Sequence, residues 1–100
     1  MLENKIFKIV DAVREIPISG TEYTLENSGL VYELCTAGDE LNIAKVNVLA
    51  SGEGDSKAWV ALDKLIEDTL LAIPDITEVK IHHRPHSNLS HCPKEIQKMF

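Results

Sequence analysis

The sequence predicts an α/β fold of the α+β kind, a two-layer sandwich in which a small mixed sheet of three to four strands carries helices packed on one side. The first observation behind this prediction is the order of the hydrophobic patterns, which runs helix, strand, strand, helix, strand, short helix. The second is the length of 100 residues, the usual size of one domain. We therefore expect a single domain over residues 1–100, with a C-terminal tail and a short helix over residues 85–100.

The first predicted element is a helix over residues 2–16. Apolar residues recur there at spacings of three and four, which places them on one face: Leu2, Ile6, Ile9, Val10 and Val13. Pro17 cannot continue the helix, because it has no backbone N–H to donate. The polar connection that follows, residues 17–29, is long for a compact domain. Its length indicates a functional loop, or a short strand or helical turn near Tyr23–Leu25.

Two strands are predicted next, Leu30–Thr36 and Leu41–Ala50, joined by a tight turn at Ala37–Asp39. Cys35 lies at the end of the first strand, where a cysteine is typically a small buried hydrophobe. In the second strand apolar residues occupy both odd and even positions, so both faces of the strand carry them. It is therefore either a central strand covered on both faces or a strand with a bulge near Ala44–Lys45.

The second half of the chain begins with a glycine-rich loop and the strongest helix pattern, Lys57–Ile73. Asp55 or Ser56 supplies the N-cap oxygen of this helix. The buried stripe is expected to contain Trp59, Leu62, Leu65, Ile66, Thr69, Leu70 and Ile73. Pro74 ends the helix, Thr77–His83 reads as the third strand, and a proline at position 93 suits the start of a last short helix.

The charge balance excludes some classes of partner. Acidic residues outnumber basic ones by 16 to 10, for a net charge of −6, which repels a nucleic-acid backbone and an anionic membrane surface. The N-terminal residues do not resemble a signal peptide, and two cysteines are too few for a disulfide framework. We expect a cytoplasmic protein with free thiols, the alternative being one Cys35–Cys92 bridge.

The sharpest local anomaly is a cluster of metal-ligand residue types near the C-terminus: His82, His83, His86, His91 and Cys92. Imidazole and thiolate are the ligands that zinc and iron prefer. Neighbouring residues on a strand point to opposite faces, so His82 and His83 cannot easily share one metal ion. The predicted set is therefore His83, His86, His91 and Cys92. The alternative interpretation is a solvated loop with ordinary hydrogen bonds, because the spacing matches no standard zinc pattern.

Other candidate sites give weaker signals. The loop Gly52–Ser56 joins a strand to a helix, where backbone amides can hold an anion, but it lacks the residues of a phosphate-binding loop and carries two acids. An ordinary turn with an N-cap is the alternative. No pattern of nucleophile, base and orienting acid is recognisable, so the sequence does not indicate an enzyme.

Several stretches resemble one known family, the small metal–sulfur cluster biosynthesis domain. This family includes SufT-like proteins, the PaaD-like subunit of phenylacetate degradation and the N-terminal domain of Mrp/ApbC-type carriers. The Glu-Ile-Pro-Ile of residues 15–18 resembles the end of the family's Asp-Pro-Glu-Ile-Pro-Val stretch, and Ser28–Leu34 resembles its Leu-Gly-Leu-Val-Tyr strand. The turn at Ile73–Val79 and a proline-containing tail with Pro85 and Ser90 are also similar.

The positions that match the family motif one by one are Glu15, Gly29, Leu30, Val31 and Tyr32. Family members usually carry Gly-Cys-Pro in the loop after the second strand, and that cysteine is the expected cluster-related residue. The corresponding loop here, residues 51–55, has no cysteine. The resemblance therefore implies the fold but transfers no cysteine ligand to this chain.

The function that the resemblance implies is that of an accessory factor in iron–sulfur cluster assembly or delivery. It would act by contact with other proteins, either the assembly machinery or apo-targets. Its cofactor would be an iron–sulfur cluster or zinc, held by the predicted histidine and cysteine set. An exposed strand edge also offers a surface for a homodimer. The alternatives are a protein-interaction domain without a metal, and a PaaD-like subunit of a larger enzyme assembly.

Overall fold

The computed structural model describes residues 2–39, 42–51, 56–74, 76–84 and 89–100. It confirms the predicted fold class, with three helices and a three-stranded mixed sheet in the expected order. The elements are α1 (Leu2–Arg14), β1 (Tyr32–Asp39), β2 (Asn42–Ser51), α2 (Lys57–Leu71), β3 (Glu78–Arg84) and α3 (Lys94–Met99). Among these described helices, none is long and apolar enough to cross a membrane.

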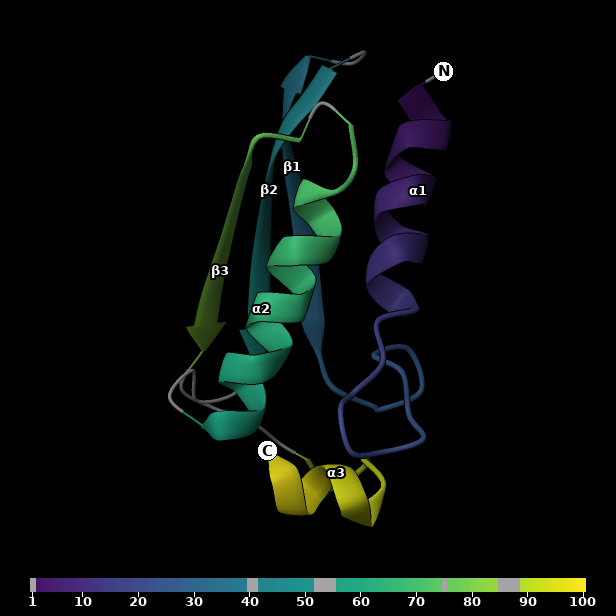
Figure 1. Cartoon of the computed structure of the whole chain (residues 1–100), viewed down its shortest axis with the longest axis vertical. Helices are drawn as coiled ribbons and strands as arrows, with labels where there is room; N and C mark the ends of the chain where they lie inside the picture. The colour runs from purple at the N-terminus through teal and green to yellow at the C-terminus, as the bar shows by residue number, and fades with distance from the viewer. Residues whose placement is uncertain (1, 40–41, 52–55, 75, 85–88) are drawn as a thin grey trace.

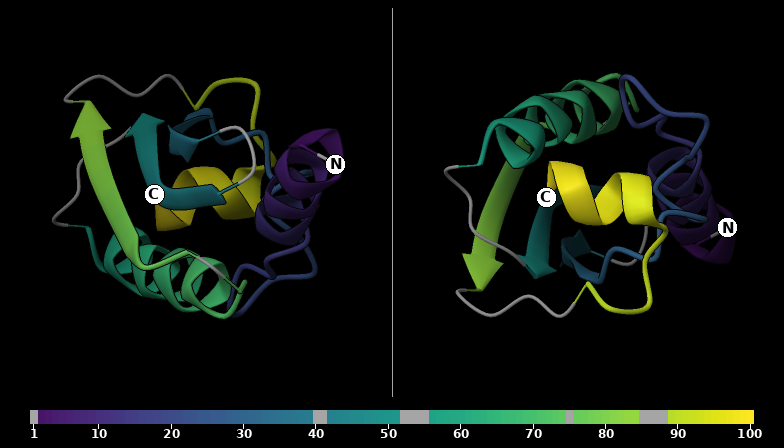
Figure 2. Two further views of the ribbon diagram at one scale, coloured as in Figure 1. Left: turned by 90° about the horizontal axis from the view of Figure 1, so that it is seen from above. Right: turned by 90° about the horizontal axis from the view of Figure 1, so that it is seen from below.

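The sheet has the order β1-β2-β3, with β1 antiparallel and β3 parallel to the central strand β2. The parallel pairing requires a crossover, and α2 provides it. Helices α1 and α2 lie on the same side of the sheet, and α3 lies across one end (Figures 1 and 2). The inward residues Val46, Val48 and Ala50 of β2 are buried beneath these helices. On the opposite face, Cys35 is exposed, so the expectation that it is a buried hydrophobe is wrong.

A β-bulge explains the two apolar phases of β2. Ala37 pairs with Lys45 and Gly38 with Ile43, which leaves Ala44 as the extra residue of β2 and confirms the bulge interpretation. The carbonyl of Ala44 accepts a hydrogen bond of 2.8 Å from the backbone N–H of Thr77. The turn predicted at Ala37–Asp39 is wrong in position, because β1 continues past the bulge to Asp39.

The core lies between the sheet and the two long helices. The side chain of Ser56 accepts a 3.1 Å hydrogen bond from the backbone N–H of Trp59 and so caps α2. Of the two residues predicted for this role, Asp55 and Ser56, the cap is therefore Ser56. The buried residues of α2 are Trp59, Leu62, Ile66 and Leu70, all from the predicted stripe. In α1, Ile9 and Val13 are buried but Ile6 is 38% exposed, so only part of the predicted stripe faces the core.

The connection between α1 and β1 is ordered rather than a plain loop. Pro17 and Thr24 form an isolated antiparallel bridge, and the backbone N–H of Ile18 donates to the carbonyl of Tyr23 at 2.9 Å. These bonds fold the connection into a small hairpin whose apolar side chains enter the core, with Ile18 and Leu25 both buried. The predicted helix also ends earlier than expected, at Arg14.

Candidate functional site

Three of the segments that carry the family resemblance meet at one end of the molecule, namely residues 15–18, the Ser28–Leu34 turn and strand start, and the tail; the Ile73–Val79 turn lies at the opposite end (Figure 1). We call the end where the three segments meet the α3 end, and define it as the connection 15–31, the first two turns of α2, the last residues of β3 and the tail 89–100. The parallel strands β2 and β3 both finish there, and α2 begins there (Figure 1). In open α/β sheets the carboxyl ends of parallel strands are the usual place for a site.

The contact between Gly29 and Cys92 joins the family motif to the tail. Gly29 has a φ of +78°, a conformation that favours glycine. A Cβ atom at this position would lie 3.1 Å from the Sγ of Cys92, so the tail packs directly on the glycine backbone. The Nε2 atom of His91 forms a 2.9 Å hydrogen bond with the carbonyl oxygen of Gly29. Buried Ser28 steadies the turn, since its hydroxyl donates to the Leu25 carbonyl at 2.8 Å.

This contact determines the chemistry of Cys92. Its side chain is buried, and burial raises the pKa of the Cys92 thiol above its ordinary value of 9.0. Metals bind the thiolate rather than the thiol, and a raised pKa keeps the sulfur protonated at neutral pH. In this conformation Cys92 is therefore a packing residue and a poor ligand.

His83 belongs to a second group, which lies between β3 and α2. Its Nε2 atom is 2.6 Å from the Oδ2 atom of Asp63, and both side chains are largely buried. The ring of Trp59 meets the imidazole edge-on, with 5.1 Å between the ring centroids. Burial raises the pKa of Asp63 above its ordinary value of 3.8, while the hydrogen bond to His83 opposes the shift.

The remaining polar atoms of this pair, Asp63 Oδ1 and His83 Nδ1, are buried and have no hydrogen-bond partner among the described residues. A general base must present its free nitrogen to a substrate within hydrogen-bond reach. Here the free nitrogen is enclosed, so the geometry is that of a structural pair. It ties the end of β3 to α2 and does not form an open catalytic dyad.

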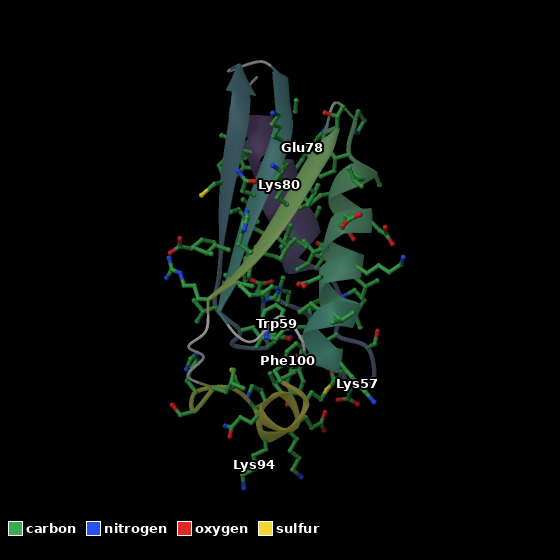
Figure 3. All side chains as sticks on the ribbon, turned by 90° about the vertical axis from the view of Figure 1, so that its left-hand side faces the viewer. Lys57, Trp59, Glu78, Lys80, Lys94 and Phe100 are labelled. Atoms are coloured by element: carbon green, nitrogen blue, oxygen red, sulfur yellow. The ribbon has the colours of Figure 1, made fainter. Side chains whose placement is uncertain are left out.

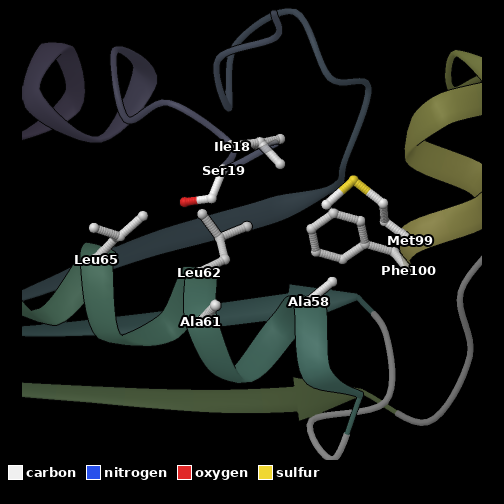
Figure 4. Close-up of a pocket in the computed structure, with 8 residues that line it drawn as sticks. All are labelled: Ile18, Ser19, Ala58, Ala61, Leu62, Leu65, Met99 and Phe100. Atoms are coloured by element: carbon white, nitrogen blue, oxygen red, sulfur yellow. The ribbon is translucent and has the colours of Figure 1, made fainter. Parts of the chain in front are cut away.

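Trp59 links this pair to the C-terminus. Its ring also meets Phe100 edge-on, with the centroids 5.2 Å apart, and the two side chains lie together at the end of β3 (Figure 3). Beside Phe100 is a small apolar pocket, which is also lined by Ile18, Met99 and residues of α2 (Figure 4). Its volume of about 30 Å³ suits a water molecule rather than an organic cofactor, which needs roughly 300 Å³ or more.

The predicted metal ligands take part in different contacts. His83 pairs with Asp63, whereas His91 and Cys92 pack on the Gly29 turn. His86 lies outside the described residues, as do residues 52–55 of the glycine-rich loop. Across the part of the chain that the structure describes, no three His, Cys, Asp or Glu side chains are grouped as a metal site would require. The described members of the set do not fit a resident cluster as they stand, and the four-ligand set stays a prediction.

Sequence reasoning missed Asp63 and Phe100. The predicted buried stripe of the helix does not include Asp63, yet this residue lies one turn after Trp59 and its side chain is largely buried. A carboxylate at spacing four from a buried tryptophan was the available signal. Phe100 is the last residue and gave no periodic signal, although it packs against the core. Of the motif residues, Glu15 and Val31 are exposed and Leu30 is buried.

Comparison with family models, with curated proteins and with solved structures finds no match for this chain. The family resemblance therefore rests on the quoted motif residues.

Proposed function

We propose that this chain is a cytoplasmic accessory factor in iron–sulfur cluster assembly or delivery, and that it acts by contact with a partner protein that carries the cluster. The cluster is cargo in this proposal and not a resident cofactor. The supporting observation is the contact of the matched turn, at Gly29, with the tail residues His91 and Cys92, which joins the two segments into one packed unit at the α3 end.

The residues of the α3 end favour contact over ligation. Cys92 is buried, and His83 and His91 are engaged in hydrogen bonds within the chain. The outer surface of α3 instead presents charge: Lys94 and Lys98 are exposed and lie four residues apart on one helix face, and one exposed acid, Glu95, lies beside that face. In a chain of net charge −6 this is a local basic surface, which suits an acidic region of a partner.

The test is the rate at which a loaded scaffold protein transfers its cluster to an apo-acceptor, followed by the visible absorption or activity of the acceptor. A substoichiometric amount of this protein is expected to raise the transfer rate. Iron and labile sulfide in the untagged protein, purified without oxygen, are expected to be well below one equivalent, and to be the same in a Cys92→Ala variant. No change in the transfer rate would contradict the proposal.

A second candidate function is a protein-interaction domain unrelated to clusters. The observation that favours it is the absence of a cysteine from residues 51–55, where the family usually has one. Transfer that is unaffected by this protein, together with metal-free protein that binds no iron on titration, would support this second candidate.

A further inference from the structure

The outer edge of β3 carries an inference that goes beyond the proposed function. Within the described residues, β3 pairs with β2 alone, so the backbone groups on its other side have no strand partner. The edge of β1 differs, because α1 lies beside it, whereas β3 forms the outward boundary of the sheet (Figures 1 and 2). An unpaired edge of this kind is a template for another strand.

The side chains of β3 divide cleanly between the two faces of the sheet. Val79, Ile81 and His83 are half-buried beneath α2. The alternate positions face the uncovered side, where Glu78 and Lys80 project from the strand edge (Figure 3). Read along the strand, the uncovered face carries an acid at one end, Glu78, and a base at the other, Arg84.

We propose that two copies of this chain associate through the outer edges of β3, antiparallel and centred on Ile81, so that two three-stranded sheets become one of six strands. A two-fold axis perpendicular to the sheet keeps the helices of both copies on the same side. Ile81 then faces Ile81 of the second copy. Glu78 faces Arg84 of the second copy, and this pair occurs twice.

The charge pattern and the length of the strand together select this register. Moving the centre to Lys80 places that lysine against itself, and moving it to His82 places Lys80 against Arg84 of the second copy. Like charges directly opposite each other destabilise an antiparallel pair. Centring on Ile81 avoids both conflicts, and it is also the only register in which all seven residues of β3 overlap.

Ion pairs within each chain extend the complementary pattern. Lys45 Nζ lies 3.5 Å from a carboxylate oxygen of Glu78, and a guanidinium nitrogen of Arg84 lies 3.8 Å from a carboxylate oxygen of Glu33. In the dimer these residues form a row of alternating sign across the interface: Lys45, Glu78, then Arg84 and Glu33 of the second copy. Isolated exposed ion pairs contribute little, but a network of several charges with regular geometry contributes more.

Sedimentation velocity over a range of protein concentrations, in reducing buffer, tests the proposal. Wild type is expected to show a reversible dimer that weakens with added salt. Arg84→Glu and Glu78→Arg are each expected to raise the dimer dissociation constant by at least about tenfold, because each turns two attractive pairs into two repulsive ones. The double variant is expected to regain the wild-type affinity, since the swapped charges are again complementary.

Matched control variants on α2 show whether a change in the dissociation constant comes from the paired positions on β3 or only from the altered net charge. Lys64→Glu and Glu67→Arg change exposed residues by the same charge as Arg84→Glu and Glu78→Arg, and they are expected to leave the dissociation constant unchanged. Wild type that stays monomeric up to millimolar concentration would overturn the proposal. A dimer that tolerates both β3 reversals, or a double variant no better than the single ones, would overturn it too.

Disulfide trapping shows directly which β3 residues of the two copies lie opposite each other. Lys80 is expected to lie opposite His82 of the second copy, so a mixture of Lys80→Cys and His82→Cys proteins, both in a Cys35→Ser background, is expected to cross-link on mild oxidation. Each protein alone is expected to cross-link more slowly. Faster self-linking of either variant would show another register and overturn the one proposed.

Discussion

Replacement of Gly29 by alanine tests whether the turn and the tail form one packed unit. The substitution has two costs at this position. The φ of +78° is unfavourable for any residue with a Cβ atom. The new Cβ atom would also lie 3.1 Å from Cys92 Sγ and 3.3 Å from Cys92 Cα, closer than ordinary van der Waals contact. Gly20 is a matched control, because its φ is +85° and no atom would lie within 4 Å of its Cβ.

The two positions therefore separate backbone strain from steric overlap. A left-handed conformation costs a residue with a side chain about 1–2 kcal/mol, and this is the whole expected loss for Gly20→Ala. Overpacking a well-filled site adds about 1–3 kcal/mol, so Gly29→Ala is expected to lose about 2–5 kcal/mol of the free energy of unfolding. In a domain of this size the larger loss is a substantial part of the total stability.

The assay is equilibrium unfolding in urea, followed by the fluorescence of Trp59. This is the only tryptophan, it is buried, and it contacts Phe100 of the tail. The same substitution in a Cys92→Ala background removes the sulfur atom, so the Gly29→Ala penalty is expected to fall there by about 1 kcal/mol. Equal losses for Gly20→Ala and Gly29→Ala, or an unchanged penalty in the Cys92→Ala background, would refute the packing argument.

Single side chains at the cap of α2, at the two thiols and beside His83 also have measurable effects. Ser56→Ala is expected to cost about 1 kcal/mol in urea unfolding, because the helix loses its N-cap, whereas Ser56→Asp is expected to retain most of the stability. A thiol reagent is expected to react fast with one sulfhydryl per chain and slowly with the other, since Cys35 is exposed and Cys92 is buried. Cys35→Ser is expected to remove the fast phase, and loss of the slow phase instead would contradict the assignment. Because burial raises the pKa of Asp63 above 3.8, the folded state binds that proton more tightly than the unfolded chain does. The resulting stabilisation is complete below pH 3.8 and is lost as the pH rises through the folded pKa. The stability of wild type relative to Asp63→Asn is therefore expected to rise as the pH falls towards 3.8, and a difference that falls instead would show that the His83 bond outweighs burial.

Features set by local physics were predictable from the sequence. The helix of Lys57–Leu71 was recognisable because its apolar residues repeat with the helical period, and Ser56 stands where a cap is needed. The bulge at Ala44 was indicated by a change of phase along one strand. The wrong turn prediction at Ala37–Asp39 also has a local cause. Glycine and aspartate are typical turn residues, but glycine in a strand can also mark a β-bulge, as it does here.

Features that depend on contacts distant in sequence were not predictable. Asp63 and His83 are 20 positions apart, and Gly29 and His91 are 62 apart, so no local pattern indicates their hydrogen bonds. The cluster of histidines suggested one site, yet the fold separates its described members. His83 is part of a strand, whereas His91 and Cys92 lie in the tail and contact the Gly29 turn. The exposure of Cys35 followed from which sheet face the helices cover, and a single strand pattern does not reveal this.

The central claim is that this protein assists cluster transfer by contact at the α3 end. The most direct measurement is the transfer rate from a loaded scaffold to an apo-acceptor with a Lys94→Glu/Lys98→Glu variant. The control is a Lys8→Glu/Lys64→Glu variant, which makes the same charge change at exposed positions of α1 and α2. We predict that the α3 variant no longer accelerates transfer, whereas the control does so as well as wild type. Equal acceleration by both variants, or none by wild type, would contradict the claim.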